Sequence, residues 1–450
     1  MRARRGAGRV AVAVTVVGLL LGASGCGTNT QDNAGEVAGG VRLYGSDGNM
    51  SNSFAAGLKD RPGVLAGMKG TAPLTRLSAG FKRRLKAIDP NIIDYVYAGE
   101  TYDAVVIAGL AAEMAHTTEP TTIAKFVNGV TASGTTCDSG QACLGLVREG
   151  KDIAYRGVSL RRSGFTDAGE PSTASYGTLN FGRNNQLDDG KTEYVGAGSE
   201  SAETKQPSPP PSTKPTKSAE PLRLGGLLPH TGTLAGAGPA MFAGARLAVS
   251  DLNDAGGVLG QRVEWVDGDD GTSPSVASAT VDRFIAGGVD VIIGASGSGI
   301  CLAVLQKVVA AGRLMISPSA TSDALTPAPD KGLFFRTAPP DTLQARALAD
   351  IIMRDGGQRL LIVARDNAYG TGLQKGVEAD LKAAGAKASD IRLVTYPDND
   401  KFTDKDVASI FGPVAKVIKS FNPHGVLIIG YDESSMVVKA MLDAGIKLHD

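Results

Sequence analysis

The sequence has no excess charge of either sign, because its 46 Lys and Arg residues equal its 46 Asp and Glu residues. It therefore lacks the basic field that usually marks a nucleic-acid-binding surface, and we expect no nucleic-acid partner. Only four histidines are present, and their spacing fits no metal site. The sequence also has no His-Glu-x-x-His and no Gly-x-x-x-x-Gly-Lys-Ser/Thr, and no Gly-x-Ser-x-Gly stands where a strand turns into a helix. We expect neither an enzyme nor a cofactor.

Long apolar runs are missing as well. Val10 to Leu21 is apolar, but it is shorter than the roughly 20 residues that a membrane-spanning helix needs. Arginines precede this run and small residues follow it, an order typical of a secretion signal. The segment before Cys26 resembles a bacterial lipobox, although Ala23 stands where such boxes usually carry Leu. We expect lipidation of Cys26, with residues 1–26 as signal and anchor; ordinary secretion with cleavage nearby is the alternative.

Cysteine is rare, with four residues in the chain. Cys137 and Cys143 flank a short polar stretch, and export would permit a disulfide between them, although so small a loop gives modest stabilisation. A metal site is less favoured, because no His or further Cys lies nearby to complete it. Cys301 precedes Leu302-Ala303-Val304 and is expected to be a small buried hydrophobic residue.

Two low-complexity segments divide the chain. Residues 27–40 are polar and Gly-rich and are expected to form a flexible tether, and residues 196–220 are Pro-rich and are expected to form an extended linker. They separate a block at 41–195 from a block at 221–450. Strand patterns alternate with helical patterns in the second block, which predicts an α/β fold with parallel sheets. Its expected strands are 263–266, 289–293, 314–316, 359–363, 391–396 and 426–429.

The first block also has α/β character. Its expected strands are 41–44 and 64–66, and its expected helices are 81–88 and 104–115. The second of these helices is apolar nearly all round and is expected to be well buried.

The second block resembles the branched-chain amino-acid-binding proteins of ABC importers. The motifs that carry the resemblance occur in family order along residues 221–450, and they are Gly226–Val249, Asn253–Gly260, Ile293-Gly294-Ala295, Ile316–Thr321, Phe335-Arg336-Thr337 and the Asp366–Gly370 segment. The resemblance implies a two-lobed type I periplasmic-binding-protein clamshell, in which each lobe is a mostly parallel sheet with helices on both faces. It also implies capture of an amino-acid-like solute, with an ABC permease as partner.

The first block resembles the C-terminal half of the same family. Its matching motifs are shorter, and they are Gly45–Gly48, Tyr102–Val105, Tyr155-Arg156-Gly157 and Gly169-Glu170-Pro171. The two halves therefore stand in swapped order, which predicts a circular permutation with residues 196–220 joining the usual termini and with both blocks contributing to each lobe. We expect a monomer; a dimer that exchanges incomplete halves and a rearranged chain are the alternatives.

The resemblance also suggests ligand contacts, and each has a plainer reading. Ser298 matches the family's carboxylate-binding serine and also suits a helix N-cap. Ala320 and Thr321 match the second carboxylate contact and also suit a turn before a capped helix. Tyr369 matches the aromatic residue that covers the ligand, although a core tyrosine would look the same. Asp47 matches the acidic residue for the ammonium group, although Asp before Gly is common in turns.

The side-chain pocket departs from that of some family members. Ala237 stands where they carry an aromatic residue before the helix-opening Gly238, and His230 lies in the same loop. The preferred solute can therefore differ from Leu, Ile or Val. Two functions remain open at this point: solute capture for an importer by a protein anchored on the outer face of the cell membrane, and a ligand sensor that does not transport.

Overall fold

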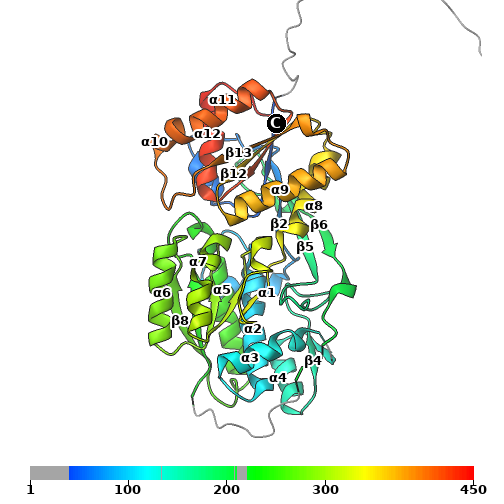
Figure 1. Ribbon diagram of the computed structural model, residues 1–450, viewed down its shortest axis with the longest axis vertical. Helices are drawn as coiled ribbons and strands as arrows, with labels where there is room; N and C mark the ends of the chain where they lie inside the picture. Colours follow the sequence, from blue (N-terminus) through cyan, green and yellow to red (C-terminus); the bar gives the residue numbers. More distant parts are fainter. Residues whose placement is uncertain (1–39, 133, 207, 210–219, 450) are drawn as a thin grey trace, which may run out of the picture. The chain divides into compact units, whose positions relative to one another are not determined.

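The computed structural model describes residues 40–449 except 133, 207 and 210–219. Two large sheets organise the described residues (Figure 1). One has seven strands in the order β13-β12-β14-β1-β2-β5-β6, and its first five strands are parallel. The other has five parallel strands in the order β11-β10-β9-β7-β8. Each sheet with its helices is called a lobe below.

The seven-stranded lobe draws on both halves of the chain. Its strands are β1 (Arg42–Gly45), β2 (Lys69–Pro73), β5 (Thr173–Asn180), β6 (Glu193–Gly198), β12 (Leu360–Arg365), β13 (Ile391–Tyr396) and β14 (Gly425–Ile429). Its helices are α8 (Asp341–Arg354), α9 (Ala368–Ala383), α10 (Asp404–Asp406), α11 (Gly412–Phe421) and α12 (Ser435–Asp443). Strand β1, from the start of the described chain, pairs with β14, from its end.

The five-stranded lobe also mixes the two halves. Its strands are β7 (Arg223–Leu228), β8 (Glu264–Asp269), β9 (Val291–Gly294), β10 (Leu314–Ser317) and β11 (Phe334–Arg336), with a small separate sheet of β3 (Thr135–Cys137) and β4 (Ile153–Tyr155). Its helices are α1 (Ala79–Ile88), α2 (Ala98–Ala115), α3 (Pro120–Val127), α4 (Gly140–Arg148), α5 (Gly238–Asp254), α6 (Pro274–Ala286) and α7 (Ser298–Ala310).

Alternate residues of a strand enter two different cores, because the seven-stranded sheet is covered on both faces. Leu361 and Val363 of β12 belong to one cluster of buried side chains, which includes residues of α11 and α12. Leu360 and Ile362 belong to the other, which includes residues of α8 and α9. Burial on both faces explains why this strand is a continuous apolar run.

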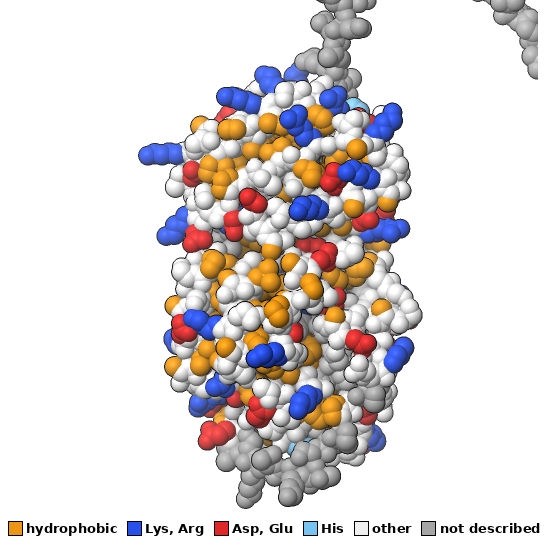
Figure 2. Space-filling view, in the orientation of Figure 1, with side chains coloured by type: hydrophobic (Ala, Val, Ile, Leu, Met, Phe, Trp, Pro, Cys, Tyr) orange, Lys and Arg blue, Asp and Glu red, His pale blue; other side chains and the backbone are white. Residues whose placement is uncertain are grey.

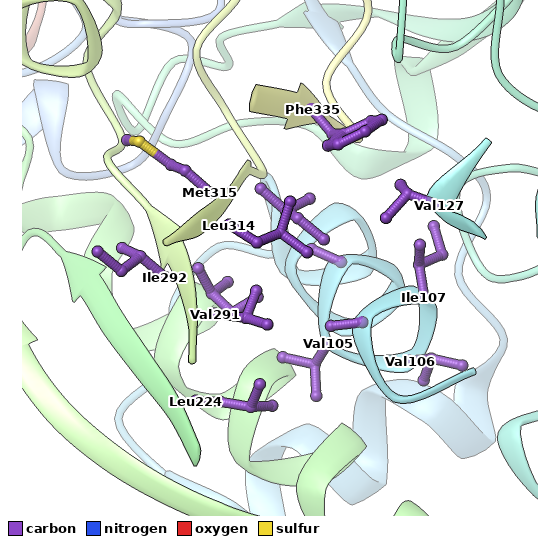
Figure 3. Close-up of a cluster of buried hydrophobic side chains, with 14 of the residues drawn as sticks. Val105, Val106, Ile107, Val127, Leu224, Val291, Ile292, Leu314, Met315 and Phe335 are labelled. Atoms are coloured by element: carbon purple, nitrogen blue, oxygen red, sulfur yellow. The ribbon is translucent and has the colours of Figure 1, made fainter. Parts of the chain in front are cut away.

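Helix α2 is the central element of the other core. All 18 of its residues are buried, in agreement with the mostly apolar sequence of residues 104–115, and the buried set also includes Glu100 and Asp103. Val105 faces Val291 of β9 and Leu314 of β10, whereas Ile107 lies on the other side of the helix beside Val127 of α3 (Figure 3). This helix comes from the first half of the chain and these strands come from the second, so the core of this lobe forms only when both halves are present.

The chain crosses between the lobes at three fully described places: residues 74–78, 156–172 and 337–340. Residues of all three crossings, Thr75, Pro171 and Pro339, line one small pocket of about 10 Å³. The crossings therefore lie next to one another. The segment between β6 and β7 also joins the lobes, and it is described in part.

Most expected elements are present with small shifts at their ends, including β13 at residues 391–396. One expectation is wrong: residues 64–66 form turns rather than a strand. The strand that follows is β2, whose sequence Lys-Gly-Thr-Ala-Pro carries little strand signal. It is a strand because β1 and β5 pair with its two edges.

The surface agrees with the balanced composition. Lys and Arg side chains are interspersed with Asp and Glu side chains over the face that Figure 2 presents. Within the described part of the chain, no helix is both long and apolar enough to cross a bilayer.

Candidate functional site

The candidate site is a cavity at the carboxyl ends of the central strands. The seven-stranded lobe contributes Asp47 after β1 and Tyr431 after β14, and the five-stranded lobe contributes Ser296 after β9 and Ser319 after β10. The carboxyl ends of parallel strands are the usual place for ligands in α/β folds. The cavity holds about 50 Å³, which is room for a few waters.

Asp47 is buried, with 7% of its surface exposed, and of the five predicted ligand residues it is the one that lines the cavity. Its Oδ1 accepts a hydrogen bond from the Tyr369 hydroxyl at 2.7 Å. Its Oδ2 accepts one from the Tyr97 hydroxyl at 2.5 Å. Burial raises the pKa of Asp47 above its ordinary value, and these hydrogen bonds oppose the rise. Because no cation pairs with it in the described residues, the carboxylate suits a ligand ammonium group.

Tyr369 supports Asp47 rather than facing the cavity. Its ring stacks on Tyr431 with centroids 5.6 Å apart, and its hydroxyl also contacts Ser46 Oγ at 2.7 Å. Tyr431 lines the cavity instead. The two tyrosines together form the aromatic wall on the side of the seven-stranded lobe.

Ser298 is the first residue of α7 and is 2% exposed. Its Oγ accepts a hydrogen bond from the Ser322 backbone N–H at 3.1 Å. The residue at the N-cap position is Gly297, so the N-cap reading of Ser298 is wrong. In this segment the cavity is lined by Ser296 rather than by Ser298.

Ala320 and Thr321 follow β10 and are almost completely buried. A network behind them fixes their backbone. Arg336 donates to the carbonyl oxygens of Ala320 at 3.2 Å and Ser322 at 2.9 Å. Arg336 also pairs with Glu170 Oε2 at 2.5 Å. The guanidinium thus holds the loop that contains two of the predicted contacts.

A group of buried polar atoms lies near Asp47, and Thr321 is the one residue of the group that the sequence analysis singled out. These atoms belong to four side chains, each with at most 1% of its surface exposed: Thr321, Asp341, Gln344 and Tyr176. The atoms Thr321 Oγ1, both carboxyl oxygens of Asp341, Gln344 Oε1 and the Tyr176 hydroxyl have no hydrogen-bond partner among the described residues. Buried polar atoms without partners are rare in proteins, and a ligand or ordered water usually accounts for them.

Asp341 is the charged member of that group. Burial first, and the charge of Asp47 second, raise its pKa well above the ordinary value. It begins α8 directly after Pro339-Pro340, at the crossing between the lobes. In the sequence it reads as an ordinary acidic residue in the first turn of a helix, so no local signal distinguishes it.

Two more carboxylates line the cavity, Asp94 and Asp432. Burial raises the pKa of Asp94 to about 6 and that of Asp432 to about 7. Neutral donors hold both groups: the Ser53 hydroxyl donates to Asp432 at 2.9 Å, and the Asn52 backbone and side chain donate to Asp94 at 2.8 Å. No Lys or Arg lines the cavity in the part of the chain that the structure describes.

The two lobes meet closely at this cavity. A Cβ atom at Gly236, from the loop after β7, would lie 2.3 Å from Ser53 Oγ and 2.7 Å from Asp432 Oδ2. Glycine is therefore required there while the lobes are together. The Ser322 hydroxyl also donates to the Ala368 carbonyl at 2.9 Å, another contact between the lobes.

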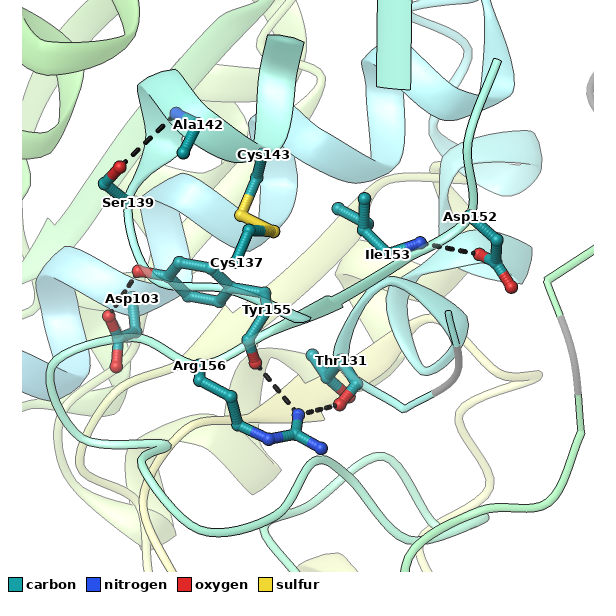
Figure 4. Close-up of a disulfide and its surroundings, with 10 residues drawn as sticks. All are labelled: Asp103, Thr131, Cys137, Ser139, Ala142, Cys143, Asp152, Ile153, Tyr155 and Arg156. Carbon is teal, nitrogen blue, oxygen red and sulfur yellow. Dashed lines mark hydrogen bonds between the residues drawn. A yellow bond between two sulfur atoms is a disulfide. The ribbon is translucent and has the colours of Figure 1, made fainter. Parts of the chain in front are cut away.

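The remaining predicted residues lie elsewhere. Cys137 and Cys143 are joined in a disulfide between β3 and α4 (Figure 4). Cys301 is buried and free, and burial raises the pKa of its thiol to about 12. Cys26 lies outside the described residues. No group of three His, Cys, Asp or Glu side chains suited to a metal ion occurs within the described ranges.

Two lobes of mostly parallel sheet, with a cavity at the carboxyl ends of their central strands, define a clamshell protein of the α/β class. The sequence profile of the family described as "Periplasmic binding protein" matches residues 221–449, which is just over half of the chain. The chain therefore belongs to the periplasmic binding protein family.

Curated relatives match about half of the chain. The Leu/Ile/Val-binding protein homolog 3 of Brucella melitensis is 28% identical over 50% of this chain and 59% of its own length. BraC3 of Rhizobium johnstonii, a Leu/Ile/Val-binding protein, is 30% identical over 49% of this chain and 58% of its own length. The Leu/Ile/Val-binding protein of Escherichia coli is 29% identical over 51% of this chain and 60% of its own length. The chain thus spans less than two thirds of the length of these relatives.

Solved structures show a similar partial match. A leucine-binding protein of Thermotoga maritima is 23% identical, with a TM-score of 0.43 over 50% of this chain and 61% of that one. A branched-chain amino-acid-binding protein of Streptococcus pneumoniae in complex with isoleucine is 21% identical, with a TM-score of 0.38 over 49% of this chain and 68% of that one.

Proposed function

We propose that this chain is an extracytoplasmic solute-binding protein that captures an amino acid or a similar small solute for an ABC importer. The observation that carries the proposal is the buried Asp47 carboxylate, which faces a closed cavity opposite hydroxyl groups of the other lobe. A free amino acid carries an ammonium group for the carboxylate and a carboxylate for hydroxyl and N–H donors. The names of the curated relatives support the same class of solute.

In this proposal each lobe binds one end of the solute. Asp47 of the seven-stranded lobe receives the ammonium group. Ser298, the N-terminal turn of α7, and the backbone of Ala320 and Thr321 in the five-stranded lobe receive the carboxylate. Tyr369 holds Asp47 in place. Because the contacts lie on opposite lobes, the solute stabilises the closed state over the open one.

We further propose that the chain is a circularly permuted member of its family. The pairing of β1 with β14 supports this proposal. Two backbone hydrogen bonds between Val41 and residues 447–449 support it as well. The Val41 N–H donates to the Lys447 carbonyl at 2.9 Å, and the His449 N–H donates to the Val41 carbonyl at 3.0 Å. In the usual family order these two segments would be consecutive. A monomer anchored through lipid on Cys26 completes the proposal.

A thermal-shift screen of amino acids and small carboxylates tests the function. A solute that binds only the folded state raises the melting temperature in a saturable way. We expect such a rise for one class of amino acid, and we expect Asp47→Asn to abolish it. Asp254→Asn, an exposed carboxylate of α5, is the matched control and should respond like the unaltered protein. A cooperatively folded protein that no amino acid stabilises would contradict the proposal.

Reordering the chain tests the permutation. A chain with residues 221–450 first and residues 37–205 second restores the usual family order. We expect the reordered chain to fold, and we expect the solute to raise its melting temperature as much as it raises that of the natural chain. A reordered chain that fails to fold, while the natural order folds, would exclude one intact permuted fold.

A further inference from the structure

The cavity carries more negative charge than the proposed function needs. One carboxylate, Asp47, suffices for the ammonium group of an amino acid. Asp94 and Asp432 also line the cavity, and Asp341 lies behind Asp47. No basic side chain lines the cavity within the described ranges. The question is what balances this charge when the lobes hold a solute.

The carboxylates form two separate pairs. Asp47 and Asp341 interact with each other, since the charge of Asp47 contributes to the raised pKa of Asp341. Asp94 and Asp432 are neighbours as well, since they line the same cavity and accept hydrogen bonds from the adjacent residues Asn52 and Ser53. The first pair lies at the predicted ammonium site. The second pair therefore marks another position in the cavity with the same electrostatic preference for a cation.

A zwitterionic solute cannot balance both pairs. Its ammonium group compensates one carboxylate, but its own carboxylate adds another negative charge to a site that excludes water. Enclosing carboxylates without a cation is costly, and protons or a cationic ligand must offset the cost. Asp341 makes the excess more severe, because it is 1% exposed and neither of its carboxyl oxygens has a hydrogen-bond partner in the described part of the chain.

The wall of the cavity suits the apolar part of a solute that ends in a cationic group. Val96, Leu234, Ala237, Ala240 and Met241 are all apolar and line it together with the carboxylates. An apolar wall that ends in charged groups matches a methylene chain with a cationic tip.

We propose that the solute carries a second cationic group besides its α-ammonium group, as a basic amino acid does, and that Asp94 and Asp432 bind this second group. The inference rests on the proposed function and specifies its class of solute. Asp432 follows β14 in the seven-stranded lobe and Asp94 lies in the segment that leads into α2 of the five-stranded lobe. A cation between them would draw the lobes together, as Asp47 does at the other end.

The test compares ligands that differ by one charge. Isothermal titration calorimetry of the purified full chain is run with L-lysine, L-arginine and L-norleucine, the last having the same chain as lysine without its terminal amine. We expect the basic amino acids to bind at least about tenfold more tightly than norleucine, the effect of one charge-assisted hydrogen bond. Asp432→Asn and Asp94→Asn should remove most of that preference, because they should weaken lysine and arginine binding far more than norleucine binding. Asp254→Asn should keep it.

The other outcomes separate the inference from the function on which it rests. Norleucine or leucine binding as tightly as lysine would overturn the inference and still support amino-acid capture. Asp432→Asn and Asp94→Asn weakening lysine and norleucine equally would also overturn it, because both carboxylates would then only hold the loop at residues 51–53. A folded protein that binds none of these amino acids would overturn the proposed function and the inference together.

Discussion

The Tyr97 hydroxyl donates a hydrogen bond of 2.5 Å to Asp47 Oδ2. Tyr97 directly precedes α2 of the five-stranded lobe, and Asp47 lies two positions after β1 of the seven-stranded lobe. The bond therefore links the lobes through the carboxylate that is proposed to bind the solute. A solute ammonium group must share or replace this donor, so the tyrosine and the solute stabilise the same closed arrangement.

Replacing Tyr97 by Phe should shift the solute-free protein toward its open form. The lost bond goes to a charged group, and such bonds contribute about 1.5–3 kcal/mol, enough to change the ratio of closed to open protein by about tenfold or more. Small-angle X-ray scattering should show a larger radius of gyration without solute and the unaltered value with it. Tyr95→Phe, a partly buried neighbour, is the control. Identical scattering of both variants without solute would show that the bond does not hold the lobes together.

Replacing Glu170 by Gln should weaken both stability and binding. Arg336 is 1% exposed, and removing the negative charge of its partner leaves a buried cation uncompensated, at a cost of about 3 kcal/mol. The same guanidinium holds the carbonyl oxygens of Ala320 and Ser322, so the loop should lose its fixed position. Urea unfolding measures the first effect and calorimetry the second.

The surface pair Lys382–Glu378 provides the matched control, because it is partly exposed and lies along one helix. Glu378→Gln should change stability by less than about 0.5 kcal/mol. Equal effects of the two substitutions would contradict the buried-pair argument.

Stability of the solute-free protein should fall as pH rises from about 5 to 8. The pKa of Asp94 is raised to about 6 and that of Asp432 to about 7, whereas both lie near 4 in an unfolded chain. Between these values the folded chain binds more protons than the unfolded chain, so the free energy of unfolding decreases as pH increases. Melting temperatures across this range measure the slope.

Asp432→Asn should flatten that slope, because an amide does not titrate. Asp254→Asn should leave it unchanged. A melting temperature that rises from pH 5 to pH 8 would mean that groups with lowered pKa values dominate, contrary to the burial described here.

Removing the disulfide should cost little and leave binding intact. Cys137 and Cys143 are six positions apart, and a loop of this size stabilises by about 2 kcal/mol. The double substitution to Ala should lower the free energy of unfolding by about that amount. Neither cysteine lines the cavity, so the affinity for solute should stay within twofold. A large loss of affinity would mean that this corner of the lobe is coupled to the site.

The sequence predicts the alternation of strands and helices because most strands are buried on both faces and read as apolar runs, as at Leu360–Arg365. It does not predict β2, whose residues carry little strand preference and depend on pairing with β1 and β5. Of the cavity residues, Asp47 was predicted through the resemblance of Gly45–Gly48 to a family motif. Tyr97, Asp341 and Asp432 were not, because their importance arises from how distant segments meet when the lobes close.

The three adjacent crossings at residues 74–78, 156–172 and 337–340 have a mechanical consequence. A single connecting segment would behave like a ball joint, letting one lobe swivel in any direction about the other. Three segments side by side resist twisting and sideways sliding, and they leave bending about one shared axis as the easy motion. Each closing stroke should therefore follow nearly the same path and return the same pairs of side chains to register.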